Sequence, residues 1–343
     1  PSLNKIAKNN QLAFGTIDSW LIWKLTNGKQ HVTDVTNASR TLIFNIKELR
    51  WDQELIDLIG IPDNILPKVV SCSEHVGNTE KNILGSEIPI TGIAGDQQAS
   101  LFGQMCLDEG DIKNTYGTGC FCMMNTGEKI VKSKNRLLST IAYQLNNKTF
   151  YAIEGSIFTA GSLVQWLRDQ LGIISSSSEI ESLASTVKDS GGVTFIPALS
   201  GLGAPYWNPK ATGSLLGITR GTEKGHIARA ALEGIAIRTY EIIQNMQKDA
   251  NTQFTNLKVD GGASNNNLLM QIQCNLIEAN VIRPIITETT ALGVGYLAGL
   301  GSGYWKSIED LKNIWKYDRE FLPEISNKEN ILSKWKETIN VLY

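Results

Sequence analysis

The residues best suited to chemistry lie in a short run around Asp96. Residues 91–95, Thr-Gly-Ile-Ala-Gly, are small or apolar, and Asp96 follows them directly. We expect this apolar run to be a strand that ends at Asp96, and residues 97–105 to form a helix. In open α/β sheets, ligands gather at the carboxyl ends of strands, where the next helix directs its N-terminal N–H groups. Asp96 is therefore a candidate acid-base group at a ligand-binding edge.

A second candidate is the turn Gly117-Thr118-Gly119, which separates two runs that predict the strands of a hairpin. Glycines let backbone N–H groups approach an anion closely, and the Thr118 hydroxyl adds a donor. Taken alone, this turn fits an ordinary hairpin better than a binding site. It becomes a stronger candidate for a binding site because further Gly-rich segments follow in the chain.

The most informative of these segments is the stretch 257–266, in which Leu257-Lys258-Val259-Asp260 runs into Gly261-Gly262. We expect a strand here, then a helix opened by Ser264, which would place backbone donors and a positive helix end over one spot. The segment lacks the third glycine of a dinucleotide fingerprint, and the sequence contains no P-loop motif. Such a turn still suits a nucleotide, without either of these two motifs.

Two predicted helices carry small residues that could serve a ligand or only packing. Gly161 and Gln165 lie one turn apart, and a glycine there would let a flat group lie close to the helix, although helix packing explains it as well. The run 289–299 is lined with small residues, for which we favour close packing. His226, at the start of a long helix, is expected to cap that helix or to lie on the surface.

The elements before Asp96 must position it without adding chemistry of their own. The pattern predicts a short buried helix over 16–25, a polar loop over 31–41, a strand over 42–46 and a helix over 51–59. His31 and Arg40 lie in or beside the polar loop. We expect structural hydrogen bonds from both, because loop backbone needs such partners.

Composition limits the class of protein. The chain has 343 residues, of which 42% are hydrophobic, so two domains with a cleft between them are expected. The formal charge of −2 gives no general attraction to nucleic acid or to a membrane surface, and no stretch approaches ~18 apolar residues, so we expect no membrane span. The five scattered cysteines favour buried thiols in a reducing cytoplasm. The chain opens without Met, which fits a fragment.

Long motifs resemble the FGGY family of carbohydrate kinases. They are Gly95-Asp96-Gln97-Gln98, residues 116–121 (Tyr-Gly-Thr-Gly-Cys-Phe), residues 201–207 (Gly-Leu-Gly-Ala-Pro-Tyr-Trp) and Val259-Asp260-Gly261-Gly262, with a C-terminal signature in residues 213–218 and 226–233. The opening blocks 14–25 and 32–41 resemble the branch that phosphorylates glycerol. The resemblance covers nearly the whole chain.

The resemblance implies an actin-like ATPase fold, in which two RNase H-like α/β domains enclose a nucleotide cleft. Residues 1–105 would be the later part of an incomplete first domain on the polyol side, and residues 106–343 the second domain on the nucleotide side. Missing from the sequence are the family's N-terminal phosphate hairpin and several glycerol-pocket residues. The chain is therefore expected to be an N-terminally truncated fragment that is inactive alone.

The resemblance also assigns roles to single residues. Asp96 corresponds to the catalytic base, Gln97 to a partner of a glycerol hydroxyl, and Phe121 to a wall against the glycerol backbone. Five residues correspond to ATP contacts: Thr118, Gly161, Gln165, Gly262 and Asn266. No residue of the chain is assigned to a metal, although Mg²⁺ is expected to bridge the ATP phosphates.

The implied reaction is transfer of the γ-phosphoryl group of ATP to a primary hydroxyl of glycerol, in a cytoplasmic enzyme that forms a dimer or tetramer when intact. Because an alcohol is a very weak acid, Asp96 would orient the hydroxyl and accept its proton as the P–O bond forms. One alternative is another sugar or polyol kinase of the family. Another is an actin-like ATP-binding protein without acceptor chemistry, which would have no use for a base beside an apolar wall.

Overall fold

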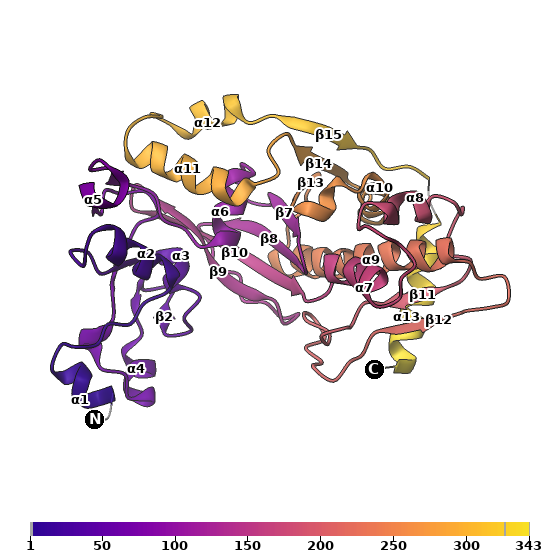
Figure 1. The fold of residues 1–343 in the computed structure, drawn as a ribbon, viewed down its shortest axis with the longest axis horizontal. Helices are drawn as coiled ribbons and strands as arrows, with labels where there is room; N and C mark the ends of the chain where they lie inside the picture. The colour runs from indigo at the N-terminus through magenta and orange to yellow at the C-terminus, as the bar shows by residue number, and fades with distance from the viewer. Residues whose placement is uncertain (1–2, 326, 343) are drawn as a thin grey trace.

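A computed structural model describes residues 3–325 and 327–342. Its main feature is a seven-stranded sheet with the order β15-β14-β13-β7-β8-β10-β9. Helices cover both faces of this sheet, as Figure 1 shows. The expected α/β class is therefore confirmed. The strands are β7 (Ile112–Tyr116), β8 (Cys120–Gly127), β9 (Leu138–Leu145), β10 (Lys148–Ile157), β13 (Asn256–Asp260), β14 (Asn280–Pro284) and β15 (Tyr317–Phe321).

The sheet is mixed. β7 pairs parallel with β13, which pairs parallel with β14, whereas β7, β8, β10 and β9 form an antiparallel series. The expected hairpin is present, since β7 and β8 are joined by the turn 117–119. Because β7 and β13 run in the same direction, their carboxyl ends lie at one edge. The turns after Tyr116 and Asp260 therefore lie side by side.

Alternation along the strands divides the core into two layers. Met124 and Ile153 pack with helices α7, α9 and α10, whereas their neighbours Met123 and Ala152 pack with α6 and α11 on the other face. This is the period of two expected of strands buried on both faces. The helices are α6 (Asp96–Gly103), α7 (Gly161–Asp169), α9 (Lys224–Ala250), α10 (Asn267–Ile277) and α11 (Thr289–Gly301).

Helices α6 and α11 touch through glycines, as the small residues of 289–299 predicted. A Cβ built on Gly293 would lie 1.8 Å from the Ala99 carbonyl oxygen, and one on Gly103 would lie 2.1 Å from the Thr289 carbonyl oxygen. No side chain fits in such gaps, so the helices pack backbone to backbone. This contact fixes the position of the helix that begins at Asp96.

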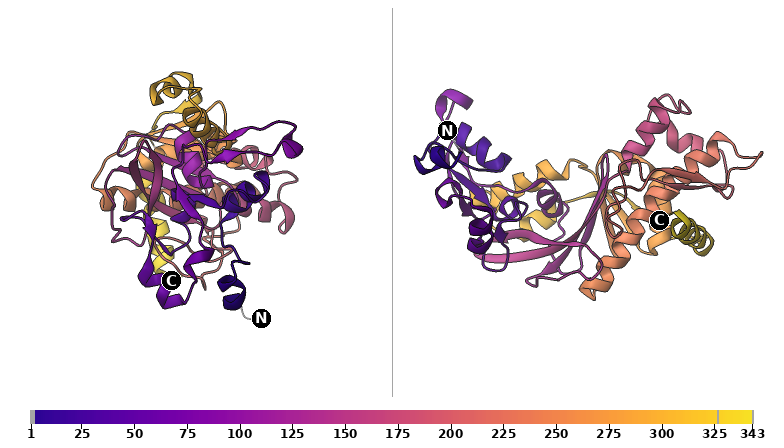
Figure 2. Two further views of the ribbon diagram at one scale, coloured as in Figure 1. Left: turned by 90° about the vertical axis from the view of Figure 1, so that its left-hand side faces the viewer. Right: turned by 90° about the horizontal axis from the view of Figure 1, so that it is seen from below.

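The N-terminal elements lie at one end of the molecule, beyond β9, and α13 lies at the other (Figures 1 and 2). They are α1 (Leu3–Lys8), α2 (Ile17–Leu25), β1 (Val32–Asp34), α3 (Val35–Ala38), β2 (Phe44–Asn45), β3 (Arg50–Trp51), α4 (Gln53–Ile59), η1 (Asp63–Ile65), β4 (Lys68–Val70), β5 (Gly77–Asn78), α5 (Lys81–Leu84) and β6 (Pro89–Ile90). The remaining elements are α8 (Glu179–Ala184), β11 (Thr194–Ile196), β12 (Ser214–Leu216), η2 (Gly262–Asn265), α12 (Ile308–Ile314) and α13 (Lys328–Leu342).

Several sequence expectations need correction. The run 91–95 is not a strand, because the strand β6 ends at Ile90 and the chain continues in irregular form to α6. The strand expected over 42–46 is reduced to two residues. Helix α2 forms as predicted but is not buried, since Trp20 and Leu21 are 58% and 53% exposed. Its apolar residues do not share one face of a helical period, so a single neighbour cannot cover them.

No helix in the described part of the chain is long and apolar enough to cross a membrane. All five cysteines are buried and free, as the sequence predicted.

Candidate active site

Asp96 and Gln97 occupy the first turn of α6. Gly95 is the N-cap residue, Asp96 is exposed, and the Asp96 carboxylate accepts a hydrogen bond of 2.7 Å from the Gln97 backbone N–H. Asp96 thus lies exposed at the beginning of a helix as expected, although an irregular segment rather than a strand leads to it. An acidic group in this position is also stabilised by the partial positive charge of the helix N-terminus.

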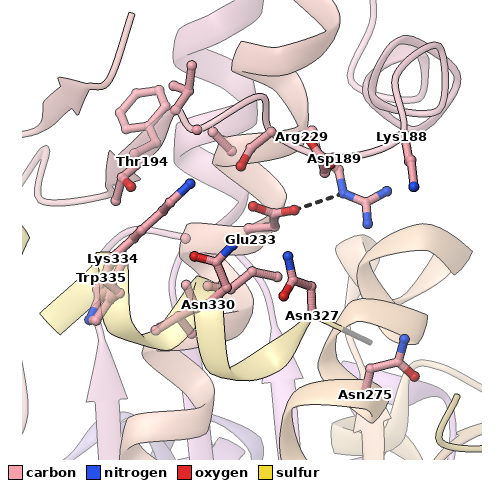
Figure 3. Close-up of a pocket in the computed structure, with 18 of the residues that line it drawn as sticks. Lys188, Asp189, Thr194, Arg229, Glu233, Asn275, Asn327, Asn330, Lys334 and Trp335 are labelled. Carbon is pink, nitrogen blue, oxygen red and sulfur yellow. Dashed lines mark hydrogen bonds and ion pairs between the residues drawn. The ribbon is translucent and has the colours of Figure 1, made fainter. Parts of the chain in front are cut away.

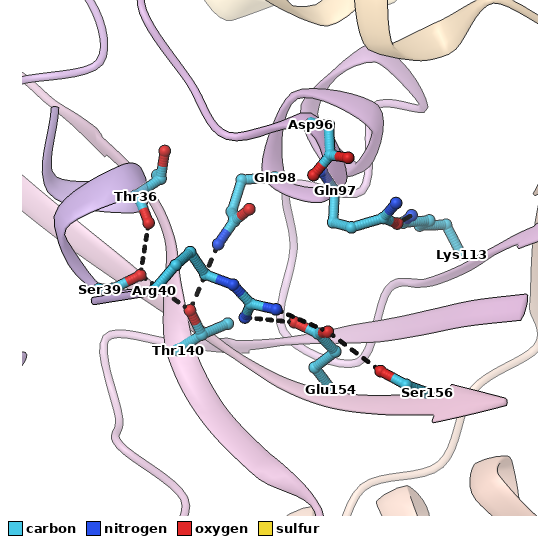
Figure 4. A network of polar contacts seen from close by, with 10 residues as sticks. All are labelled: Thr36, Ser39, Arg40, Asp96, Gln97, Gln98, Lys113, Thr140, Glu154 and Ser156. Carbon is cyan, nitrogen blue, oxygen red and sulfur yellow. Dashed lines mark hydrogen bonds and ion pairs between the residues drawn. The ribbon is translucent and has the colours of Figure 1, made fainter. Parts of the chain in front are cut away.

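A buried lysine holds Gln97. The Lys113 ammonium, 0% exposed, donates 2.6 Å to Gln97 Oε1 and 2.7 Å to Thr115 Oγ1. Burial lowers the pKa of Lys113, and the nearby carboxylates of Asp260 and Glu154 act in the opposite direction. Figure 4 shows the Gln97 amide directed toward the end of the Lys113 side chain.

Phe121 belongs to the same row of side chains. It is half-buried on β8 and pairs directly with Thr115 across the hairpin. Because cross-strand partners point to the same face, Phe121, Thr115 and Lys113 lie on the side of the sheet that α6 covers. The structure therefore places Gln97, Lys113 and Phe121 on the same side of the sheet, although no cavity among those described is lined by Gln97, Phe121 and Asp96 together.

The segment before Asp96 is held by a buried network. Asp34, which is fully buried, accepts hydrogen bonds from the Thr36 and Asn37 backbone N–H groups and from both of their side chains. Burial raises the pKa of Asp34, and these hydrogen bonds oppose the rise. The Thr36 hydroxyl in turn accepts 2.8 Å from the Gly95 backbone N–H. Asp34 and Thr36 thus fix the residue directly before Asp96.

Arg40 connects the N-terminal elements with the sheet. Its guanidinium donates two hydrogen bonds, of 2.7 and 3.0 Å, to the carboxylate of Glu154 on β10. The Glu154 side chain is completely buried, whereas that of Arg40 is 37% exposed. Figure 4 shows this pair next to Gln98, which donates 3.3 Å to Thr140. The structural role expected of Arg40 is confirmed, and His31 likewise hydrogen bonds to a backbone carbonyl, at Phe14.

A cavity of about 500 Å³ lies at the carboxyl end of β7, and all five residues expected to contact a nucleotide line it: Thr118, Gly161, Gln165, Gly262 and Asn266. Its apolar wall comes from Val164, Ile180, Leu232, Ile235 and Leu269. These residues come from the β7–β8 turn and from α7, α8, α9 and the start of α10. Only the fold brings them together, because they span residues 118–269.

Gly161 and Gly262, two of the glycines that line this cavity, differ in what surrounds them. A Cβ on Gly161 would lie 2.6 Å from the Gly117 carbonyl oxygen, so packing of α7 on the hairpin turn already requires a glycine there. A Cβ on Gly262 would meet no atom within 4 Å, and Gly262 is not among the residues with a positive φ. The protein itself therefore gives no reason for a glycine at 262. A ligand that approaches the backbone closely would give one.

The polar side chains of the cavity differ in whether they hydrogen-bond to the rest of the protein. Thr118 and Gln165 are exposed and make no side-chain hydrogen bond within the described residues. Asn266, by contrast, is the N-cap of α10, and its side chain accepts 2.8 Å from the Leu269 backbone N–H. The expectation that Ser264 opens this helix is wrong, because 262–265 form a 3₁₀ turn and the Ser264 hydroxyl donates to the Gly261 carbonyl.

Asp260 links one of the turns that line this cavity to α6. Its buried Oδ2 accepts hydrogen bonds from Ser100 at 2.9 Å, Gln104 at 3.0 Å and Thr289 at 2.6 Å. Asp260 directly precedes Gly261, and its strand partner is Thr115. The start of α6 and the nucleotide turns are therefore parts of one connected arrangement on β7 and β13.

A second cavity, of about 530 Å³, lies between α9, α13 and the segment 188–195 (Figure 3). Glu233 is buried in its wall, paired with Arg229 at 3.0 Å, and burial raises the pKa of Glu233. None of the residues that the sequence singled out for chemistry lines this cavity. It carries no part of the candidate active site.

Sequence reasoning missed Lys113, Glu154 and Asp260. Glu154 follows the apolar run Tyr151-Ala152-Ile153, which is a signal of a buried partner, because an unpaired charge is costly to bury, whereas Lys113 lies in a polar run that gives no such signal. Such a signal shows that a partner exists without saying which residue it is. Among the described residues, no three His, Cys, Asp or Glu side chains lie close enough to hold a metal ion.

Comparison with known proteins agrees with this arrangement. Residues 2–103 match the N-terminal domain, and residues 112–302 the C-terminal domain, of the FGGY family of carbohydrate kinases. A glycerol kinase of Burkholderia multivorans is 52% identical over 99% of this chain and 68% of its own length. Glycerol kinase 2 of Thermotoga maritima is 54% identical over 97% of the chain and 68% of its own length.

Solved structures give the same result. The Plasmodium falciparum glycerol kinase with ADP superposes with a TM-score of 0.93 at 37% identity, over 100% of this chain and 69% of that one. A gluconate kinase of Lactobacillus acidophilus, 24% identical over 96% of this chain and 68% of its own, has a TM-score of 0.86 and shows the fold alone. The expected actin-like kinase fold is confirmed, whereas the expected N-terminal truncation is not confirmed by these matches. The chain belongs to the FGGY family of carbohydrate kinases.

Proposed function

We propose that this protein transfers the γ-phosphoryl group of ATP to glycerol, giving sn-glycerol 3-phosphate. The observation that carries the proposal is the cavity lined by all five residues assigned to ATP from the sequence, whose turn at Gly262 is joined through the neighbouring Asp260 to the helix that presents Asp96. Relatives that are 52–54% identical over 97% or more of the chain are glycerol kinases. Gluconate and xylulose kinases share the fold at 24% identity or less, which gives no support to those acceptors.

In this proposal Asp96 is the general base. Its exposed carboxylate orients the acceptor hydroxyl and takes the proton as the new P–O bond forms. Gln97 binds a glycerol hydroxyl and Phe121 lies against the carbon backbone. By aligning the acceptor hydroxyl with the γ-phosphate, these groups supply a large share of the rate enhancement, because phosphoryl transfer needs little covalent catalysis from the protein.

Mg²⁺ is proposed as the partner of the ATP phosphates, whose negative charge it neutralises when bound. The described residues form no cluster of three acidic or histidine ligands. They therefore fit a metal that is carried mainly by phosphates and water, with at most one or two protein carboxylates, rather than a dedicated metal site.

Further parts of the proposal concern the whole protein. We infer a polyol-side domain over residues 1–105 and a nucleotide-side domain over 106–343, a cytoplasmic location, no nucleic-acid partner and a dimer or tetramer as the working form. Light scattering of the product of the complete gene measures the oligomeric state. The absence of activity from residues 1–343 alone stays a prediction, which the assay below tests when it is run on both proteins.

The test is an acceptor assay on the product of the complete gene, with ATP, Mg²⁺ and glycerol, xylulose or gluconate. We expect kcat/KM for glycerol to exceed that for either alternative by at least ~10²-fold, since a site built to hydrogen-bond one substrate strongly rejects others. Preference for xylulose or gluconate would replace the proposal with the second family activity. ATP binding without phosphorylation of any polyol would favour the actin-like protein without acceptor chemistry.

A further inference from the structure

We infer that Lys113 is a positioning residue which fixes the orientation of the Gln97 side-chain amide and so makes Gln97 a pure hydrogen-bond donor toward the acceptor substrate. The inference rests on the proposed function, because it concerns the substrate side of that site. It goes beyond the assignment of Gln97, since nothing in the sequence pattern involves the lysine.

The first step is the geometry of the pair. An amide side chain has an acceptor oxygen and a two-donor nitrogen, and it can present either one to a ligand. The Lys113 ammonium has donors only, and it lies 2.6 Å from Gln97 Oε1. The pair therefore forms in one amide orientation, in which the Gln97 nitrogen points away from the lysine.

The second step is what the Gln97 nitrogen can do. It makes no hydrogen bond within the described residues, and it is not among the buried atoms that lack a partner, so it is accessible. Gln97 stands next to Asp96, whose carboxylate can only accept when ionised. The two side chains thus offer one acceptor group and one donor group. A polyol matches this, because a hydroxyl can donate to Asp96 while another oxygen accepts from Gln97.

The third step is why a lysine is buried here at all. An isolated buried ammonium is costly, and Lys113 is completely buried. Its charge is offset by Asp260 and Glu154, which lie near enough to raise its pKa against the effect of burial. Its neighbour across the parallel pair, Lys258, donates 2.9 Å to the carbonyls of Gln104 and Met105 at the end of α6. The two lysines therefore hold opposite ends of the same helix.

Lys258 supplies a matched control. It is a partly buried lysine on the adjacent strand, at the register position facing Lys113, and it contacts α6 without contacting Asp96 or Gln97. A lysine that only stabilises the helix should behave like Lys258. A lysine that orients Gln97 should change substrate binding as well.

The experiment is a double-mutant cycle on the product of the complete gene, with Lys113→Met, Gln97→Ala and the two combined. We expect each single change to raise KM for glycerol about tenfold, because each removes one hydrogen bond: the charge-assisted bond from Lys113 to Gln97, or the bond from Gln97 to the substrate. KM for ATP should stay within twofold of its value in the unaltered protein. The combined variant should be no worse than Gln97→Ala alone. Lys258→Met should lower the melting temperature and leave KM for glycerol within twofold.

Two results would overturn the inference. One is a KM for glycerol in the combined variant that is raised by the product of the two single increases, and the other is a normal KM for glycerol in Lys113→Met.

If Lys113→Met does not fold, the variant Gln97→Glu tests the inference instead, since a glutamate keeps the contact with Lys113 but offers no N–H donors. We expect it to fold with an unchanged or raised melting temperature and a KM for glycerol raised at least tenfold, and a normal KM would refute the role. Failure of the proposed function is seen separately, as absence of glycerol turnover in the unaltered protein. The cycle is then run on whichever acceptor is phosphorylated.

Discussion

At the scale of single residues, the site depends on a few polar groups held by buried partners. Asp96 and Gln97 stand at the beginning of α6, and the groups that hold them, Thr36 and Lys113, come from distant parts of the chain. The chemistry assigned to Asp96 can be separated from a merely structural role, because a carboxylate and an amide differ in charge and basicity but hardly in size.

We expect Asp96→Asn in the product of the complete gene to lower turnover by ~10²–10⁴-fold while the affinity for ATP changes little, since the amide cannot accept the proton. Steady-state kinetics and ATP titration on one folded preparation measure both quantities. Asn can keep the hydrogen bond from the Gln97 backbone N–H at the helix start. Turnover like that of the unaltered protein would therefore leave Asp96 a purely structural role.

A pair of glycine variants tests the nucleotide cavity on residues 1–343. We expect Gly262→Ala to weaken ADP binding about tenfold with the unfolding free energy unchanged, because its Cβ meets no protein atom. Gly161→Ala should weaken binding and also destabilise the fold by ~1–3 kcal/mol, because its Cβ meets the Gly117 carbonyl at 2.6 Å. Calorimetric titration and urea unfolding measure the two effects. Normal ADP affinity in Gly262→Ala would show that nothing binds against that glycine.

At the scale of elements, the position of α6 depends on its contact with α11 and on the Asp260 hydrogen bonds. The two helices touch at glycines because no side chain fits between their backbones. The active site is thus supported by packing that has no chemical role of its own.

This contact gives a stability prediction with an internal control on α11. Gly293→Ala places a Cβ 1.8 Å from the Ala99 carbonyl oxygen, so the helices must separate and we expect a loss of about 3 kcal/mol. Gly295→Ala, two residues along the same helix, meets no atom within 4 Å and should stabilise by up to ~1 kcal/mol through helix propensity. Urea unfolding distinguishes the two. Equal effects would mean that α6 and α11 do not pack as described.

At the scale of the whole molecule, the N-terminal elements are joined to the sheet by apolar packing, in which Val35, Ala38 and Phe44 share one core with strand residues such as Ile141 and Ala152, and by polar contacts that include the pair of Arg40 and Glu154. Ser39 and Gln98 add hydrogen bonds of 3.0 and 3.3 Å to Thr140 on β9. The position of the N-terminal elements relative to the sheet therefore depends on these contacts as well as on the α6–α11 packing.

We expect Arg40→Met to destabilise the protein by about 2 kcal/mol, since it leaves the Glu154 carboxylate buried and without its cation. This figure is below the usual cost of breaking a buried pair, because the Arg40 side chain is partly exposed. The double variant Arg40→Met with Glu154→Gln should recover more than half of the loss, since no unpaired charge remains. Urea unfolding of both variants is the measurement, and an additive loss in the double variant contradicts this account.

The sequence by itself determined the α/β fold class, the resemblance to the FGGY family and the glycine-rich turns. Motifs such as 116–121 and 259–262 are local, because glycines and hydroxyls act through the backbone of the same few residues. The hairpin, the helix that starts at Gly161 and the close packing of 289–299 were predicted for this reason. The shared cavity of the five proposed ATP residues was expected only from the resemblance, and no local pattern could have given it.

Only the tertiary structure decided which groups hold these motifs in place. The residues from 91 to 95 look like a strand, but their backbone makes hydrogen bonds to distant residues in place of strand pairing, such as the one that the Gly95 N–H donates to the Thr36 hydroxyl. Helix α2 looks buried by composition, yet its apolar residues point in several directions. The partners of Lys113, Glu154 and Asp260 lie 16, 114 and up to 160 residues away. Such contacts depend on how sheet and helices meet in space, which local periodicity does not encode.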